Sequence, residues 1–277
     1  MAEYFIRRGK NQITIDFSFS PVCLFDSGIG GLNVLSELKK ILPSENYLYV
    51  ADQKFCPYGN KGDEYVRSRV NKIVGFLNSF NPKIILIACN TASRFLPKDF
   101  ISSDVVMGVI KATSEYVAVE TPSKKVLLLA TKSTIEGGLY QSFFDSLKIS
   151  CDVADCGNLV DDIENMKIHE NIFAEKVKGD LINVISEDFD SVIFGCTHFD
   201  FARQSVLSVL QQPVKPIFCK DAVAPVVVKF LTERKLLGNS FIAGKTVLLT
   251  TGHLDFFRKQ LAFYNVDYDN AEKVVID

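Results

Sequence analysis

IILIACNTAS (residues 84–93) and SVIFGCTHFD (residues 191–200) share one pattern: an apolar run, then a cysteine, then polar residues that favour the start of a helix. Continuous apolar runs of this length suit strands that are covered on both faces. The repeat is too short to prove a duplication. It nevertheless suggests two lobes of similar build, each presenting one cysteine to a shared cleft.

Further apolar runs recur along the chain at spacings that often leave room for a helix. They are VCLF (22–25), YLYV (47–50), VVMGV (105–109), KVLLLA (125–130) and TVLLT (246–250). Residues 63–80 place apolar side chains on one helical stripe and polar ones opposite, which predicts an amphipathic helix. Strands alternating with helices predict an α/β fold of two similar lobes with mainly parallel sheets and an active site in the cleft between them.

The length of 277 residues is about twice the ~150 residues of one average domain, which fits two lobes. We expect residues 1–20 to form an N-terminal extension, because they lack the apolar segment of a secretory signal. Lobe 1 is expected to comprise residues 21–111 and 222–277, with Asp26 and Cys89. Lobe 2 is expected to comprise residues 112–221, with Cys196 and His198.

Composition excludes several classes of partner. A formal net charge of −2 offers no basic excess for nucleic acid. The apolar runs are far shorter than the ~20 residues that cross a bilayer, so no membrane partner is expected. The 7 cysteines include no C-x-x-C pair, which argues against a disulfide framework or a zinc ribbon. Reduced thiols in a cytoplasmic protein fit better.

The polar residues that follow the apolar runs are the candidate site, because ligands of parallel sheets bind beyond the carboxyl ends of the strands. These segments are Asp26-Ser27-Gly28, Cys89-Asn90-Thr91, Thr131 to Thr134, and Cys196-Thr197-His198. The glycine-rich turn at 26–31 matches neither phosphate-loop pattern, since Asn33 stands where the last glycine of G-x-G-x-x-G would be. Its free amides at a helix start suit a carboxylate as well as a phosphate.

Cys89 and Cys196 are the candidate catalytic residues. A lone cysteine after a strand is more often packing than catalysis, but Cys89 and Cys196 occur in matching frames, each with a potential assistant. Asp26 would assist Cys89, and His198 would assist Cys196. Helix starts lower a thiol pKa, so we expect both thiols to be activated. Two opposed thiols suit two faces of one substrate; a zinc site of Cys89, Cys196, His198 and Asp26 lacks the expected ligand spacing.

Five motifs, in this order, resemble those of the glutamate racemases within the aspartate/glutamate racemase superfamily: FDSGIGGLNVL (25–35), PYG (57–59), ACNTAS (88–93), GCTHF (195–199) and TTG (250–252). The resemblance covers about residues 21–265. It implies interconversion of L- and D-glutamate without pyridoxal, metal or any other cofactor, and a role in supplying D-glutamate for cell-wall peptidoglycan and cell shape.

The resemblance also implies residue roles. Cys89 matches the thiolate that takes the α-proton from D-glutamate, Cys196 matches the one that acts on L-glutamate, and Asp26 and His198 match the groups that assist them. The positions matching substrate-binding residues are Asp26, Ser27, Tyr58, Gly59, Asn90, Thr91, Thr131, Thr134, Glu164, Thr197 and His198. Cys56 before PYG, Lys111 after GVI and the first twenty residues depart from the family pattern, without touching the two cysteines.

Alternatives remain at this stage. The chain could racemise aspartate or another amino acid of the same superfamily, since side-chain length is read by the geometry of the cleft. It could also be a catalytically inactive relative with a binding or regulatory role, although the presence of both cysteines and both assisting residues argues against this. The small-molecule substrate is the expected partner, and a homodimer is left open.

Overall fold

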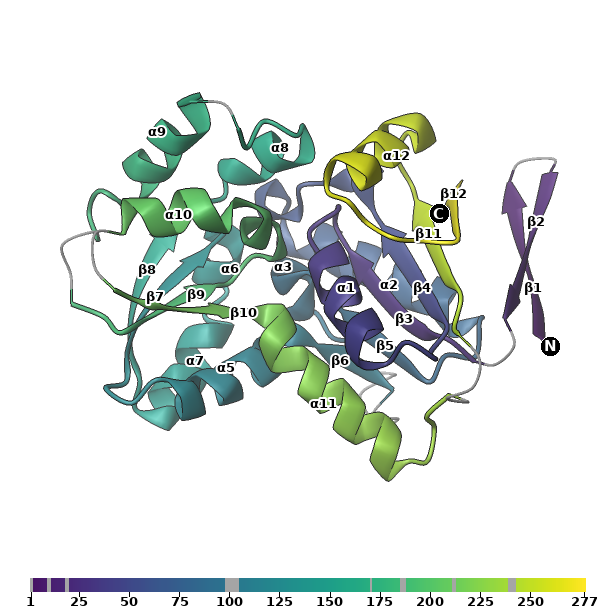
Figure 1. The fold of residues 1–277 in the computed structure, drawn as a ribbon, viewed down its shortest axis with the longest axis horizontal. Coiled ribbons are helices and arrows are strands. Elements are labelled where there is room, and N and C mark those ends of the chain that lie inside the picture. The colour runs from purple at the N-terminus through teal and green to yellow at the C-terminus, as the bar shows by residue number, and fades with distance from the viewer. Residues whose placement is uncertain are drawn as a thin grey trace.

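The structure is a computed structural model that describes residues 2–8, 11–17, 20–97, 105–169, 171–184, 188–210, 213–238 and 243–277. Within these residues, two parallel sheets lie side by side and carry helices on their faces (Figure 1). An antiparallel hairpin of β1 (Ala2–Arg8) and β2 (Asn11–Phe17) stands apart from both sheets. The predicted α/β class with mainly parallel sheets is confirmed, whereas the hairpin was not expected from the sequence.

The larger sheet has six strands in the order β12-β11-β4-β3-β5-β6, all parallel. Its inner strands are the predicted apolar runs, and every residue of them is buried because helices cover both faces. The strands are β3 (Val22–Asp26), β4 (Tyr47–Ala51), β5 (Ile84–Ile87), β6 (Val106–Gly108), β11 (Thr246–Thr250) and β12 (Asn270–Lys273); the helices are α1 (Leu32–Ile41), α2 (Asp63–Asn78), α3 (Asn90–Ser93) and α12 (Leu254–Phe263).

The smaller sheet has four parallel strands in the order β10-β9-β7-β8. Its strands are β7 (Lys125–Ala130), β8 (Ser150–Asp155), β9 (Ser191–Phe194) and β10 (Lys215–Phe218). Its helices are α6 (Lys132–Glu136), α7 (Leu139–Leu147), α8 (Leu159–Glu164), α9 (Asn171–Leu181) and α10 (Arg203–Val209). Below, each sheet with its helices is called the six-stranded unit or the four-stranded unit.

The chain passes between the sheets twice. It leaves the six-stranded sheet after β6 through α5 (Val109–Glu120) and returns to it through α11 (Cys219–Glu233), and these two helices pack against each other. The predicted lobe boundaries near 111 and 221 fall within them. The assignment of each residue to a lobe stays a prediction.

The helix predicted over 63–80 is α2, which ends two residues earlier. Its apolar stripe of Val66, Val70, Ile73, Val74 and Leu77 is buried against the sheet, as its spacing requires. Asp63 and Glu64 occupy its first turn, where negative charge interacts favourably with the helix dipole. Among the described residues, no helix combines the length and the apolar character needed to cross a bilayer.

Strand order fixes where a ligand can bind. In the six-stranded sheet β3 lies between β4 and β5, and in the four-stranded sheet β7 lies between β8 and β9. The chain leaves β3 toward β4 and β5 toward β6, on opposite sides, and it leaves β7 toward β8 and β9 toward β10 in the same manner. The strand ends between β3 and β5, and between β7 and β9, therefore form crevices. Asp26 ends β3 and Cys89 follows β5, whereas Thr131 follows β7 and Cys196 lies just beyond β9. Both cysteines thus lie at the crevice of their own sheet.

Candidate active site

The two crevices face each other across one small pocket of about 20 Å³, room for about one water molecule. Both thiols line it and are nearly buried, Cys89 with 6% and Cys196 with 8% of its surface exposed. The full lining is Ser27, Pro57, Tyr58, Gly59, Cys89, Asn90, Thr91, Thr131, Val160, Gly195, Cys196, Thr197 and His198. Ten of these residues are among those singled out from the sequence.

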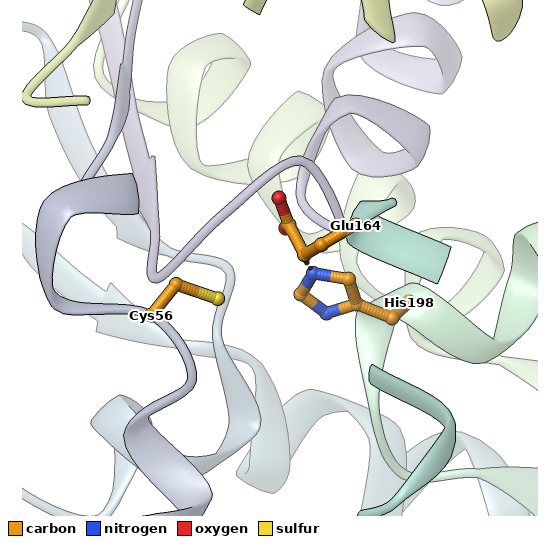
Figure 2. Close-up of side chains that lie close together, drawn as sticks. All are labelled: Cys56, Glu164 and His198. Atoms are coloured by element: carbon orange, nitrogen blue, oxygen red, sulfur yellow. Dashed lines mark hydrogen bonds and ion pairs between the residues drawn. The ribbon is translucent and has the colours of Figure 1, made fainter. Parts of the chain in front are cut away.

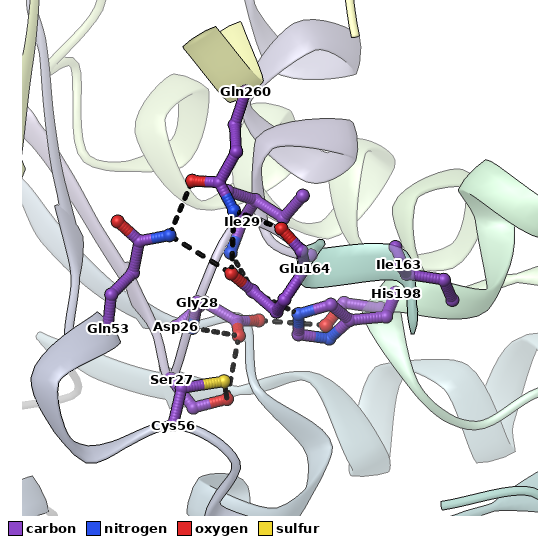
Figure 3. Close-up of polar contacts among 12 residues, drawn as sticks. Asp26, Ser27, Gly28, Ile29, Gln53, Cys56, Ile163, Glu164, His198 and Gln260 are labelled. Carbon is purple, nitrogen blue, oxygen red and sulfur yellow. Dashed lines mark hydrogen bonds and ion pairs between the residues drawn. The ribbon is translucent and has the colours of Figure 1, made fainter. Parts of the chain in front are cut away.

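A chain of contacts runs from Cys196 into the protein. His198 Nδ1 lies 3.8 Å from Cys196 Sγ, and its Nε2 lies 2.6 Å from Glu164 Oε1. Glu164 is held in turn by the side-chain amides of Gln53 and Gln260, each donating to Oε2 at 3.0 Å (Figure 3). The imidazole orientation is therefore fixed by a carboxylate that is itself fixed.

Burial and hydrogen bonding oppose each other at this pair. Burial alone would lower the pKa of His198, but its contacts with Cys196 and Glu164 outweigh burial and raise the pKa well above 6.5. Burial would likewise raise the pKa of Glu164, but the bonds from His198, Ile29 N and Gln53 lower it below 4.5. An imidazolium paired with a carboxylate follows, and this positive ring lies 3.8 Å from the sulfur of Cys196.

A shorter chain of contacts lies behind Cys89. Its thiol donates to Ser27 Oγ at 3.8 Å, and Ser27 Oγ donates to Asp26 Oδ1 at 3.2 Å. The other carboxylate oxygen of Asp26 accepts a hydrogen bond from Thr197 Oγ1 of the four-stranded unit at 2.8 Å. Burial raises the pKa of Asp26, partly offset by the positive His198. Asp26 therefore reaches Cys89 through Ser27 and also ties the two units together.

The expected activation of Cys89 is wrong for this closed pocket. Burial, and then the charge of Asp26, raise the pKa of the Cys89 thiol well above 9, although the amide of Ala92 and the hydroxyl of Ser27 act in the lowering direction. Cys89 does precede a helix, but α3 is only four residues long. Desolvation of the thiolate outweighs the short helix, so Cys89 is a neutral thiol here.

Three threonines close the pocket across the two units. Thr91 Oγ1 lies 3.1 Å from Thr131 Oγ1 and 3.2 Å from Thr134 Oγ1, and the latter two are 3.0 Å apart. The hydroxyls that we expected to bind a carboxylate thus satisfy one another in the closed state. Thr134 does not line the pocket itself but completes this triangle.

Asn90 and Tyr58, both predicted to bind substrate, direct their polar groups to buried side chains and not into the pocket. Asn90 Oδ1 accepts a hydrogen bond from Tyr140 at 2.8 Å, and its amide reaches Cys219 Sγ at 3.5 Å. Tyr58 lines the pocket, but its hydroxyl donates to Asp52 at 2.5 Å. Both side chains are therefore held in fixed orientations by buried neighbours.

The glycine-rich turn is a packing surface for the other unit. A Cβ on Gly28 would come within 1.8 Å of Glu164 Oε1, and one on Gly30 within 2.4 Å of Thr197 Oγ1. The amide of Ile29 donates to Glu164 Oε1 at 2.8 Å. The free amides of this turn do bind a carboxylate, as predicted, and that carboxylate is the side chain of Glu164.

Sequence reasoning missed the residues that support the site. Asp52 is fully buried and is paired by Arg69 through two hydrogen bonds, 3.0 Å from Nε and 2.8 Å from Nη2. Asp52 and Gln53 directly follow β4, so the rule that identified Asp26 would have identified them too. Gln260 lies inside α12 and has no such signal, because its contact with Glu164 depends on how the units pack.

The sequence raised a zinc site of Cys89, Cys196, His198 and Asp26 as an alternative, but the ligand atoms of these four described residues do not form a metal-binding cluster. Within the described part of the chain, a different set has its ligand atoms all within 4.8 Å of one another: Cys56, Glu164 and His198 (Figure 2). His198 alone is common to the two sets.

Fold and site together define a class: a two-unit α/β enzyme with one thiol from each unit at a shared, nearly closed pocket. A sequence profile described as Asp/Glu/Hydantoin racemase matches residues 32–217. The chain belongs to this family.

Individual proteins similar to this chain are glutamate racemases. A glutamate racemase of Thermoanaerobacter sp. is 31% identical over 86% of this chain and 90% of its own length. The crystal structure of the glutamate racemase isoform RacE1 from Bacillus anthracis superposes with a TM-score of 0.87 at 28% identity, covering 93% of this chain and 98% of that one. The Francisella tularensis glutamate racemase, solved in complex with D-glutamate, has a TM-score of 0.84 at 28% identity, covering 93% and 98% of the two chains.

Proposed function

We propose that this protein interconverts L- and D-glutamate without a cofactor, with Cys89 and Cys196 as the two acid/base groups. The observation that carries the proposal is that the two thiols, one from each unit, line the same small pocket. Racemisation needs one group to remove the α-proton from one face and another to return a proton to the opposite face. General acid/base transfer of this kind supplies about 10²–10⁴-fold of rate.

The surroundings of the thiols suggest how the reaction begins. His198, oriented by Glu164, lies 3.8 Å from Cys196 Sγ, whereas Cys89 is a neutral thiol. For L-glutamate, Cys196 takes the α-proton and Cys89 delivers its own proton to the opposite face. For D-glutamate the two protonation states are exchanged. Each turnover moves one proton off and one proton on, so no oxidant or reductant is needed.

Binding requires the two units to separate. A pocket of about 20 Å³ is far smaller than an amino acid, and the threonine hydroxyls that would bind a substrate carboxylate are engaged with one another. We expect glutamate to replace these mutual bonds with bonds to its carboxylates, so that closure around the substrate excludes water and stabilises the carbanionic intermediate.

The proposal is tested by following optical activity of L-glutamate and, separately, D-glutamate in metal-free, cofactor-free buffer. We expect turnover with both enantiomers, and solvent deuterium should enter mainly the product enantiomer during the first turnovers in heavy water. Cys89→Ser and Cys196→Ser should each abolish turnover, whereas Cys151→Ser, on the edge strand β8, should not. Full activity in either of the first two variants, or exchange without inversion, would end the two-thiol scheme.

The same proposal extends to specificity and to the cell. The three glutamate racemases named above support glutamate over aspartate, and a parallel assay with L-aspartate compares the two substrates. A cytoplasmic enzyme that supplies D-glutamate for peptidoglycan should restore growth of a bacterial strain that requires D-glutamate. The sequence left a homodimer open, and sedimentation of the purified chain distinguishes a dimer from a monomer.

A further inference from the structure

We propose that Cys56, Glu164 and His198 form a three-ligand site for Zn²⁺, distinct from the pair of reacting thiols. Their ligand atoms lie within 4.8 Å of one another, and in Figure 2 the three side chains converge from separate segments of the chain. One sulfur, one nitrogen and one carboxylate oxygen are all donors that Zn²⁺ accepts, and three protein ligands leave a fourth position for water.

Small side-chain movements would complete the geometry. Zn²⁺ holds its ligands at about 2.0–2.3 Å, which places them about 3.3–3.7 Å from one another in a tetrahedral site. His198 Nε2 and Glu164 Oε1, now 2.6 Å apart, would have to separate by ~0.7 Å to admit the ion. Cys56 Sγ, within 4.8 Å of both other ligand atoms, would have to approach by no more than about 1.5 Å from its position beside Ser27.

The outer contacts that orient metal ligands are already present. Glu164 Oε2 accepts hydrogen bonds from Gln53 and Gln260, while Oε1 accepts the amide of Ile29 and has a second lone pair directed to the site. The second ring nitrogen of His198 is directed to Cys196 Sγ at 3.8 Å. Metal-binding histidines and carboxylates are usually fixed in this way by a second layer of hydrogen bonds.

A route to the site exists on the side away from the reacting thiols. Cys56 and Glu164 line a pocket of about 640 Å³ that also includes Gln53, Thr251 and His253. The lining of this pocket contains neither Cys89 nor Cys196. An ion can therefore approach Cys56, which is only partly buried, without entering the pocket of the two thiols.

Charge balances on binding. Zn²⁺ binds the deprotonated sulfur, the neutral imidazole nitrogen and the carboxylate oxygen. Protons carried by Cys56 Sγ and His198 Nε2 pass to solvent as the ion enters. The ion then faces one thiolate, one carboxylate and one neutral imidazole, whose charges sum to zero with that of Zn²⁺.

The consequence, which rests on the proposed function, is inhibition. Zn²⁺ would break the bond between His198 and Glu164, and it would link Cys56 of the six-stranded unit to two residues of the four-stranded unit. The ion would occupy the ring nitrogen that now contacts Glu164, so the ring beside Cys196 would no longer be held by that carboxylate, and the ion would hold the two units closed. Zn²⁺ at this site is therefore a reversible inhibitor.

The direct test uses Co²⁺ as a spectroscopic substitute, added to the metal-free full-length protein under reducing conditions. We expect one equivalent of Co²⁺ to bind with a sulfur-to-cobalt charge-transfer band that Zn²⁺ abolishes. Cys56→Ser, and Cys56→Ala if the first variant folds poorly, should lose the band and weaken Zn²⁺ binding at least about tenfold, because even loss of an outer contact costs 10–100-fold. Cys151→Ser is the matched control and should keep both.

The proposal is overturned if Cys56→Ser binds Co²⁺ as the wild type does, if no thiolate band forms, or if the band is lost only in Cys89→Ser or Cys196→Ser. These measurements do not require activity, so they stand whether or not the chain racemises glutamate. In an active preparation, Zn²⁺ should inhibit the wild type reversibly, and Cys56→Ser should need at least about tenfold more Zn²⁺. Equal sensitivity of both proteins would remove the inhibitory role.

Discussion

His198 Nε2 lies 2.6 Å from Oε1 of Glu164, and both groups are buried at the junction of the two units. Glu164 also accepts the amide of Ile29 from the glycine-rich turn, so this contact joins the four-stranded unit to the six-stranded one. The pair both orients the ring beside Cys196 and stabilises the association of the units. Its electrostatics have a definite pH dependence.

Glu164→Gln should destabilise the protein most between about pH 4.5 and 6.5. Because the pKa of His198 is raised, its contribution is complete below 6.5 and is lost as the pH rises through the folded-state pKa. Because the pKa of Glu164 is lowered, its contribution is complete above 4.5 and is lost as the pH falls through the folded-state pKa. Removing one partner of a buried pair costs about 3 kcal/mol. Urea unfolding across this range measures the difference, and a difference independent of pH would contradict the ion pair.

The raised pKa of Cys89 predicts how its alkylation depends on pH. Peptide-resolved mass spectrometry after pulses of iodoacetamide should show a rate that increases about tenfold per pH unit from pH 6.5 to 9, because the thiolate fraction keeps increasing below the pKa. Asp26→Asn removes the charge that adds to burial, so it should speed alkylation of Cys89 at each pH. A rate that levels off near neutral pH in the wild type would mean that Cys89 is already a thiolate.

Arg94 predicts a measurable control on opening of the pocket. From the end of α3 its Nη1 donates to Ser133 Oγ of the other unit at 2.7 Å, while Nη2 pairs with Asp63 at 3.0 Å. Arg94 and Ser133 line an outer pocket of about 680 Å³ that shares Pro57, Gly59 and Thr131 with the pocket of the two thiols. The bond between Arg94 and Ser133 therefore spans the entrance.

Ser133→Ala should make the entrance open more often. A hydrogen bond contributes about 1 kcal/mol, so its loss should increase opening, and with it alkylation of Cys89, about fivefold at constant pH. Lys132→Ala is the control on the same helix, because the ion pair of Lys132 with Glu136 lies within α6 and does not cross between units. Equal alkylation rates in wild type and Ser133→Ala would exclude the bond as a barrier to entry.

The sequence predicted those strands that lie in the parts of the sheets covered by helices on both faces. β3, β4, β5, β7, β9 and β11 read as continuous apolar runs because helices cover both faces of the sheets. The strands missed within the two sheets, β8, β10 and β12, all lie at sheet edges. Four of the six residues of β8 are exposed, β10 contains Pro216, and β12 has the mainly polar sequence NAEK. An edge strand needs no apolar run, so the pattern carries little signal.

The candidate site was predictable to the extent that its residues follow strands. Asp26, Cys89, Thr131 and Cys196 come directly after apolar runs, and strand order alone brings them to facing crevices. The pKa of Cys89 was not predictable, because it depends on burial that the closing of the two units creates. Contacts such as Gln260 with Glu164 and Arg94 with Ser133 depend on the same association of distant segments.

Gly30→Ala should move the segment of Cys196 and His198 away from the glycine-rich turn, although neither cysteine is substituted. Its Cβ would lie 2.4 Å from Thr197 Oγ1, 2.7 Å from His198 Nδ1 and 2.8 Å from the backbone nitrogen of His198. The backbone contact cannot be relieved by a side-chain rotation, so the segment after Cys196 has to move away from the turn. Overpacking of this kind costs about 1–3 kcal/mol.

Gly75→Ala provides the matched control for that substitution. Gly75 lies on the exposed face of α2, where a Cβ would meet no atom within 4 Å, so alanine should stabilise the helix by about 0.5–1 kcal/mol. Urea unfolding should therefore move in opposite directions in the two variants, and alkylation of Cys196 should accelerate in Gly30→Ala alone. If Gly30→Ala were as stable and as slowly alkylated as the wild type, the turn would not be the surface against which Cys196 and His198 are positioned.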